Sequence, residues 1–190
     1  MEITDTFDVA SSPDRVWQLF LDVERVAPCM PGAELTDVID DKTWAGRVRM
    51  KIGPVSMKYS GRVVMTERDD AARRMTLRAE GAEESGKGGA TAEVRVRVDQ
   101  TAGGGAHVVI TQELALSGAA AQFGGRMIAD VSAHLTKQFA GCLSAQLSGD
   151  ASPPAASKDV PALRLAIWAF FRAIGRALRL PWGRAKKVGG

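Results

Sequence analysis

The chain has 190 residues, 45% hydrophobic and 25% charged, which is ordinary for a globular protein and enough for one domain with a substantial core and an appendage. Its formal charge of +3 hides an asymmetry: residues 160–190 hold seven basic and no acidic residues, whereas residues 1–159 hold 18 basic and 22 acidic ones, a net charge of −4. The basic charge belongs to the tail, so it is no evidence that the domain binds nucleic acid.

The cysteine and histidine residues offer no metal site. Cys29, His107, His134 and Cys142 lack the spacing of metal ligands, so we expect structural or surface roles for them. The N-terminal segment MEITDTFDVA has no apolar signal-peptide core, which predicts a cytosolic protein with two reduced thiols.

The N-terminal third begins with a strand and a helix. Apolar and polar residues alternate in residues 1–10, a pattern typical of a strand. Residues 11–26 are predicted to be helical, with Ser12 as the N-cap and Pro13 at the first helical position. The prolines and glycine of the following APCMPGA end this helix.

Six antiparallel strands are predicted to follow the helix as a meander. Apolar residues alternate with polar ones along this part of the chain, and glycine-rich loops separate the runs. The strands to which the alternation assigns limits are 43–52, 55–67, 74–80, 91–100 and 106–116.

A long helix is predicted over residues 123–147, where apolar residues recur every four positions. An antiparallel sheet with one solvated face must bury the other, and only this helix is large enough to cover it. We therefore expect an α+β helix-grip fold, with a curved antiparallel sheet wrapped around a long C-terminal helix.

The predicted inner face of the sheet is rich in methionine and poor in ionisable groups. The alternation places mainly charged residues on the outer face, which leaves no catalytic set inside. Methionine adapts to apolar ligands but also fills ordinary cores, so both interpretations stay open. The inward residues singled out from the pattern are Trp44, Met50, Met57, Tyr59, Met65, Met75, Gln112 and Met127.

Three stretches are distinctive in combination: PCMPGAEL after the first helix, KIGPVSMKYSGRV across a hairpin, and LSGAAAQFGGRMIADVSAHLTKQF leading into the long helix. Together they resemble the carbon monoxide dehydrogenase G-subunit (CoxG) family, within the helix-grip, START-like (SRPBCC) superfamily. The resemblance covers about residues 1–149.

The resemblance implies a hydrophobic-ligand-binding domain without a catalytic set or covalently bound cofactor. Members are thought to serve molybdenum-containing CO dehydrogenases at the cytoplasmic membrane, and these enzymes must pass electrons to the respiratory quinone pool. By the same resemblance, the cavity would be lined by Met57, Tyr59 and Gly61 on the second long strand and by Phe123, Met127 and Val131 on the grip helix.

The C-terminal part of the chain is predicted to be a flexible linker followed by an amphipathic helix. Residues 150–161 are small, polar and proline-containing, as in a flexible linker, and residues 162–187 are predicted to form a helix that lies on a membrane surface. Four arginines share one face and large apolar residues the other, with Leu165 and Trp168 departing from this division. The predicted membrane-binding residues are Arg164, Ile167, Trp168, Phe170, Phe171, Arg172, Ile174, Arg176, Leu178 and Arg179.

The sequence gives less support to a transmembrane helix or a nucleic-acid-binding segment in the tail. An 18-residue span would be about 27 Å long, just short of the ~30 Å hydrocarbon core. It would also bury Arg172 and Arg176 at about 2.5–3.5 kcal/mol each. Nucleic-acid binding would leave the apolar face unexplained, whereas docking on a partner protein stays open.

These observations lead to one functional hypothesis and two alternatives. The hypothesis is a non-enzymatic carrier, peripheral on the inner face of a cytoplasmic membrane with anionic lipids. It takes menaquinone or ubiquinone into the domain and presents it to a CO-dehydrogenase-type enzyme. Tyr59 and Gln112 would hydrogen-bond the quinone carbonyls. The alternatives are a passive adaptor that recruits the dehydrogenase to the membrane, and a cyclase- or hydrolase-like enzyme, which would need an ionisable side chain inside.

Overall fold

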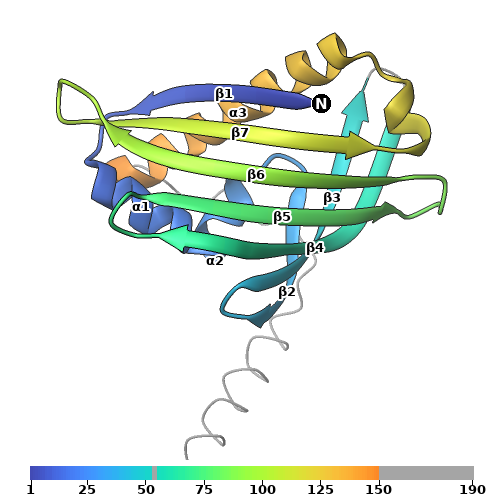
Figure 1. The fold of residues 1–190 in the computed structure, drawn as a ribbon, viewed down its shortest axis with the longest axis horizontal. Helices are drawn as coiled ribbons and strands as arrows, with labels where there is room; N and C mark the ends of the chain where they lie inside the picture. The colour runs from blue at the N-terminus through green and yellow to red at the C-terminus, as the bar shows by residue number, and fades with distance from the viewer. Residues whose placement is uncertain (53–54, 150–190) are drawn as a thin grey trace, which may run out of the picture. The chain divides into compact units, whose positions relative to one another are not determined.

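Seven antiparallel strands form a single sheet in the order β1-β7-β6-β5-β4-β3-β2 (Figure 1). The computed structural model describes residues 1–52 and 55–149, so the predicted linker and tail helix lie outside the described residues. The strands are β1 (Glu2–Val9), β2 (Ala33–Asp40), β3 (Thr43–Ile52), β4 (Val55–Asp69), β5 (Arg74–Glu83), β6 (Gly89–Gln100) and β7 (Ala106–Leu116). The predicted meander has six strands, and the alternation assigns limits to five of them. β2, the first of the six in the chain, is the strand that receives no limits.

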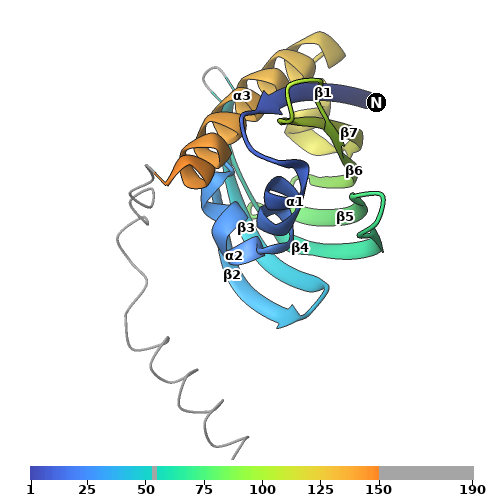
Figure 2. The same ribbon diagram turned by 90° about the vertical axis from the view of Figure 1, so that its left-hand side faces the viewer.

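The helices lie on the concave face of this sheet (Figures 1 and 2). They are α1 (Pro13–Leu21), α2 (Val23–Val26) and α3 (Gly125–Ser148), with short 3-10 turns η1 (Ala27–Cys29) and η2 (Gly118–Gln122) before β2 and α3. A curved sheet that holds a long C-terminal helix is the predicted helix-grip fold, which is confirmed. Among the described helices, none is long and apolar enough to span a membrane.

The first predicted helix is divided into α1 and α2. The Ser12 hydroxyl accepts a hydrogen bond from the Arg15 backbone N–H at 3.5 Å, and Pro13 occupies the first turn, as predicted. Asp22 leaves the helical conformation and its carboxylate accepts from the Arg25 N–H at 3.2 Å, so one residue ends α1 and caps α2. Buried side chains on α1, including Phe20, anchor it to the sheet.

Strand register separates apolar and polar side chains as the alternation predicts. Met50 pairs with Met57 and Trp44 with Val63 across β3 and β4, which places these side chains on one face. The period of two leaves charged residues on the opposite, outer face.

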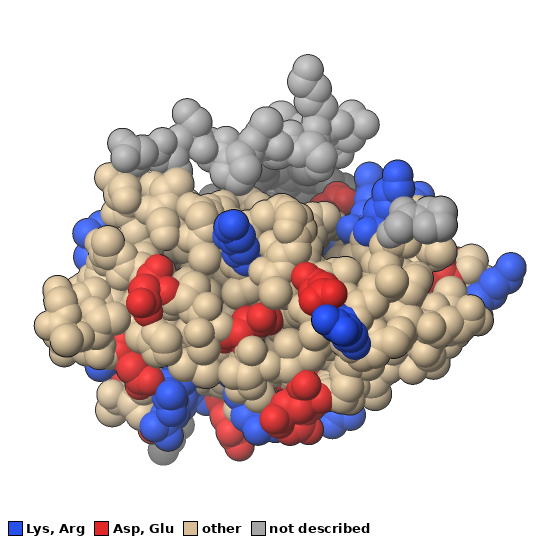
Figure 3. Space-filling model, turned by 90° about the horizontal axis from the view of Figure 1, so that it is seen from above, with Lys and Arg blue, Asp and Glu red and all other residues tan. Residues whose placement is uncertain are grey.

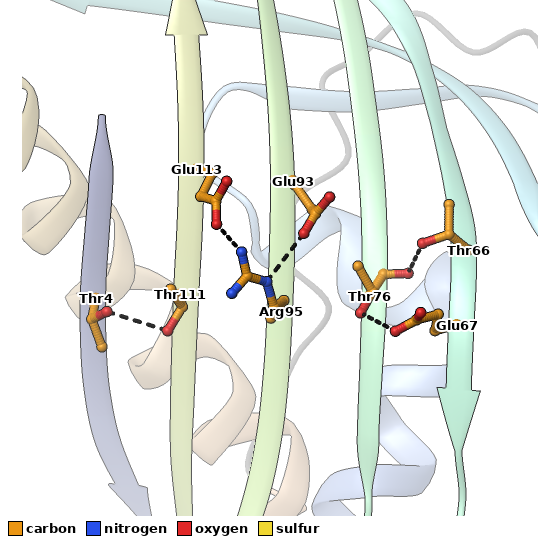
Figure 4. A network of polar contacts seen from close by, with 8 residues as sticks. All are labelled: Thr4, Thr66, Glu67, Thr76, Glu93, Arg95, Thr111 and Glu113. Carbon is orange, nitrogen blue, oxygen red and sulfur yellow. Dashed lines mark hydrogen bonds and ion pairs between the residues drawn. The ribbon is translucent and has the colours of Figure 1, made fainter.

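The outer face is tied by hydrogen bonds and ion pairs between neighbouring strands (Figure 4). Arg95 on β6 binds Glu93 at 3.1 Å and also contacts Glu113 on β7. The hydroxyl groups of Thr4 on β1 and Thr111 on β7 lie 3.2 Å apart. All these groups are exposed, so each contact stabilises the fold only weakly, by about 1 kcal/mol or less.

Helix α3 turns a different face to the sheet than an exact four-residue repeat would give. Phe139 is buried, as is Ile128, which lies eleven residues earlier and about 20° away around a helix of 100° per residue. Met127 lies about 120° from Phe139 and is 48% exposed. Each four-residue step drifts by about 40°, so the prediction that Met127 points inward is wrong. Phe123 precedes the helix, at the end of η2, and is not on the grip helix.

The two cysteines are joined, which corrects the prediction of reduced thiols. Cys29 in η1 and Cys142 in α3 form a disulfide with Cα atoms 5.4 Å apart, across a sequence separation of 113 residues. The Gln146 amide donates to the Arg25 carbonyl at 2.9 Å beside this bond. The C-terminal half of α3 is therefore attached to the segment that connects α2 and β2.

Candidate functional site

Two apolar clusters lie on the concave face of the sheet. The α1-side cluster joins α1, the C-terminal half of α3 and one end of the strands; Phe20, Val98 and Leu143 are among its buried members. The η2-side cluster lies around η2 and the N-terminal half of α3, with Ile52 and Ile128 at its centre. These clusters hold α3 against the sheet through the exclusion of apolar surface from water.

Apolar side chains that pack against these clusters on the concave face remain partly exposed. They come from four neighbouring strands and form a continuous strip across the sheet: Val63, Leu77, Val94, Ile110 and Leu114. Solvent therefore reaches part of an apolar inner surface. We call these five residues the inner strip.

The structure divides the predicted ligand residues between the two clusters. Trp44, Met65 and Met75 are buried in the α1-side cluster. Met57 is buried in the η2-side cluster, against which the partly buried Met50, Tyr59, Phe123 and Val131 pack. Gln112 is partly buried on β7. The buried members are core residues, and of the partly buried ones Gln112 pairs with Val94 of the inner strip.

The packing of neighbouring strands explains why residue 61 is a glycine, whether or not a ligand binds there. A side chain at this position would collide with the Glu80 carbonyl oxygen on the adjacent β5, so glycine permits the close approach of the two strands. Gly61 also borders an open concavity of about 660 Å³ whose side-chain lining includes Arg62, Glu80 and Thr91, which belong to the solvent phase of the strands.

A larger open concavity, of about 840 Å³, lies beside α1, α2 and the turn between β2 and β3. Its lining includes Trp44, Asp40, Asp41 and Glu24. Neither this concavity nor the one beside Gly61 is lined by any of the predicted methionines.

Tyr59 carries a hydroxyl group that can exchange its partner. It donates to the Met57 sulfur at 3.6 Å, and a thioether is a weak acceptor. Partial burial, and secondarily the charge of Glu83, raises the pKa of Tyr59 above its ordinary value of 10.0. The phenol is therefore a neutral donor at physiological pH and could turn to a better acceptor, such as a carbonyl oxygen.

A polar cluster on the concave face was missed by the sequence interpretation. The Asp5 carboxylate on β1 accepts from the hydroxyl groups of Ser132 at 2.6 Å and Thr136 at 3.3 Å, both on α3. The Gln112 amide donates to the Ser132 hydroxyl at 3.0 Å. We call these four residues the inner polar cluster. The sequence interpretation named Trp44, Tyr59 and Gln112 as the polar groups of the inner face and missed Asp5.

The signal for Asp5 was present in the alternation of β1. Ile3, Phe7 and Val9 define the inward phase, and Asp5 occupies the same phase. Within residues 1–52 and 55–149, no three His, Cys, Asp or Glu side chains gather in a way that could hold a metal ion. The site is thus an apolar strip with one polar cluster at its β1 border.

The charge pattern is mixed where the surface is seen from above. Acidic and basic side chains are interspersed among uncharged residues on this face (Figure 3). Nucleic-acid binding requires basic groups gathered along a face. The described part of this face shows no such stripe.

Comparisons with known proteins agree with the geometry of the domain. The family model that describes the G-subunit of carbon monoxide dehydrogenase (CoxG) matches residues 6–148. No curated protein sequence matches the chain.

Solved structures share the fold at low sequence identity. A conserved protein from Geobacillus kaustophilus is 17% identical with a TM-score of 0.70, over 78% of this chain and 96% of that one. The Zhui aromatase/cyclase from Streptomyces sp. R1128 is 16% identical with a TM-score of 0.57, over 78% and 93%. A START superfamily protein from Mycobacterium smegmatis is 12% identical with a TM-score of 0.52, over 78% and 97%. These likenesses show a START-like fold.

Proposed function

Because the chain belongs to the CoxG family over residues 6–148, we propose that it carries an isoprenoid quinone between a membrane and a molybdenum-containing CO dehydrogenase. The observation that carries this proposal is the inner strip, an apolar surface on the concave face that stays partly exposed although α3 covers that face. Aliphatic side chains that stay partly exposed on a concave face favour an apolar guest.

The chemistry of the strip suits a quinone. Its five residues are purely aliphatic, which matches an isoprenoid chain, whereas the borders supply a few polar groups for a head group. Tyr59 on one border offers an O–H donor that is now held by a weak acceptor. Met50 and Phe123 nearby are partly buried and can adjust to a ring.

The membrane part of the proposal rests on the sequence of residues 162–187. Seven basic residues between positions 160 and 190 could each contribute about 1 kcal/mol near an anionic leaflet, and the apolar face adds burial. The tail would hold the domain where quinones are dissolved.

Filling the inner strip tests the proposal. Val94 lies on β6 between its register partners Leu77 and Gln112, at the centre of the strip. Val94→Trp should cover the apolar surface that a guest would use, and Met127→Trp is the matched control because residue 127 is exposed on α3. The full-length protein is mixed with anionic vesicles that contain ubiquinone, and quinone in the protein fraction is measured after the vesicles are removed.

The two variants should separate transport from recruitment. Wild type and Met127→Trp should extract quinone, whereas Val94→Trp should extract at least tenfold less and still bind vesicles. If Val94→Trp supports electron transfer from the dehydrogenase to the quinone pool as well as wild type does, the protein is the passive adaptor. If wild type extracts no quinone, the carrier proposal fails.

Asp5 favours a second candidate, an enzyme. One protein that shares this fold is an aromatase/cyclase, and a carboxylate on the concave face could act as a general acid or base. A bound ligand whose mass changes during incubation with wild type but not with Asp5→Asn would favour the enzyme. An unchanged mass would favour the carrier.

A further inference from the structure

The directions of the hydrogen bonds in the inner polar cluster are set by its chemistry. A carboxylate only accepts, so at 2.6 Å the single hydroxyl hydrogen of Ser132 must point to the Asp5 Oδ2 atom. The Ser132 oxygen can then only accept from Gln112, which places the amide NH₂ group of Gln112 toward Ser132 at 3.0 Å. The Thr136 hydroxyl also donates to Asp5 Oδ2, at 3.3 Å.

The groups that remain for a ligand are mainly acceptors. Both hydroxyl donors are directed at Asp5, and one N–H of Gln112 is directed at Ser132. Asp5 Oδ1 and Gln112 Oε1 have no protein partner among the described residues, and neither atom is sealed from solvent. The cluster therefore offers a negative acceptor and an amide acceptor.

The cluster borders the apolar surface rather than the outer face. Asp5 pairs with Ile110, and Gln112 pairs with Ile3 on one side and Val94 on the other. Ile110 and Val94 belong to the inner strip, so a molecule on the strip would reach both free acceptors with its polar end.

We propose that the inner polar cluster recognises hydroxyl groups of an apolar ligand, and so holds the hydroquinone form of the carried molecule in preference to the quinone. This inference rests on the proposed function and adds a specificity to it. Hydroquinone hydroxyls can donate to Asp5 Oδ1 and Gln112 Oε1. Quinone carbonyl oxygens only accept, so the second N–H of Gln112 is the one donor that the cluster offers them, and the Asp5 carboxylate would repel them.

The preference has a measurable size and direction. A tenfold tighter binding of the hydroquinone would raise the two-electron midpoint potential of the bound couple by about 30 mV relative to the free couple. It would also mean that the domain retains the form that leaves the dehydrogenase, since CO oxidation delivers electrons to the quinone.

The test uses the full-length protein with a one-isoprene 1,4-naphthoquinone and its hydroquinone under argon. Affinities are measured by quenching of tryptophan fluorescence. The 1,4-dimethoxy derivative of the same ring, which has no hydroxyl donor, is a third ligand. We expect the hydroquinone to bind wild type at least tenfold tighter than either donor-free ligand.

Variants assign the preference to the cluster. Asp5→Asn should reduce the affinity ratio to near one, whereas Asp8→Asn, which removes an outer-face carboxylate from the same strand, should keep it. Ser132→Ala should free the Gln112 amide to donate to a carbonyl, and thereby lower or reverse the ratio. A purely structural role would weaken all ligands equally.

The outcomes distinguish this inference from the proposed function. Equal binding of quinone and hydroquinone to wild type, or an unchanged ratio in Ser132→Ala, overturns the inference and leaves the carrier intact. Binding of none of the ligands overturns the carrier proposal itself. If Asp5→Asn fails to fold, Ser132→Ala alone decides the role of the cluster.

Discussion

Truncation of Leu143 on α3 tests whether this helix is held by the α1-side cluster. Leu143 is fully buried, with 0% of its surface exposed, and lies in that cluster with Phe139. The change Leu143→Ala removes three buried carbon groups, at about 0.8 kcal/mol each in transfer free energy. The cavity left behind raises the expected loss to about 3–4 kcal/mol.

The matched control is Met127→Ala on the same helix. Met127 is 48% exposed, so its truncation should change the free energy of unfolding by about 0.5 kcal/mol or less. Both variants are unfolded in urea at pH 7 with the disulfide intact. A loss below about 1 kcal/mol for Leu143→Ala, or an equal loss for both variants, would refute the assignment of the buried face of α3.

Three further predictions concern the phenol, the disulfide and the tail. Tyr59 is the only tyrosine, so absorbance at 295 nm should show a pKa above 10.0, and Glu83→Gln should lower it only in part because burial is the larger cause. Because the folded pKa is raised, the phenol contributes stability below its unfolded pKa, and this contribution is lost as the pH rises through the folded pKa. An onset of ionisation below pH 9 would contradict the burial of the phenol. Reduction of the Cys29–Cys142 disulfide should lower the free energy of unfolding by about 2–4 kcal/mol, and a double serine variant that is insensitive to reductant serves as the control. Deletion of residues 160–190 should abolish sedimentation with anionic vesicles, and retained sedimentation would place the membrane contact on the domain.

Much of the fold is predictable because strands with one buried face repeat every two residues. Met50 and Met57 alternate with charged neighbours, and the two runs pair across β3 and β4 with their apolar side chains on one face. The start of α1 is equally local, since Ser12 and Pro13 act on the turn that follows them.

Features that depend on the third dimension escaped the sequence interpretation. An apolar series every four residues drifts around a helix, so the inward direction of α3 at Met127 depends on where the helix meets the sheet. The approach of Cys29 to Cys142 depends on the packing of α3 against η1, which 113 residues of intervening chain do not reveal.

Asp5 escaped for a different reason. Its strand phase points inward, but a carboxylate on an inner face is unfavourable without partners. Those partners, Ser132 and Thr136, lie on α3 about 130 residues later in the chain. The inward position of Asp5 is explained only by the packing of α3 against β1, which supplies its hydrogen-bond donors.

The most direct measurement of the central claim is native mass spectrometry of the full-length protein purified from the membranes of its host. A quinone carrier should retain about one isoprenoid quinone per domain, and Val94→Trp should lose it while Met127→Trp keeps it. Protein that carries no quinone, with wild type and Val94→Trp equally empty, would contradict the account.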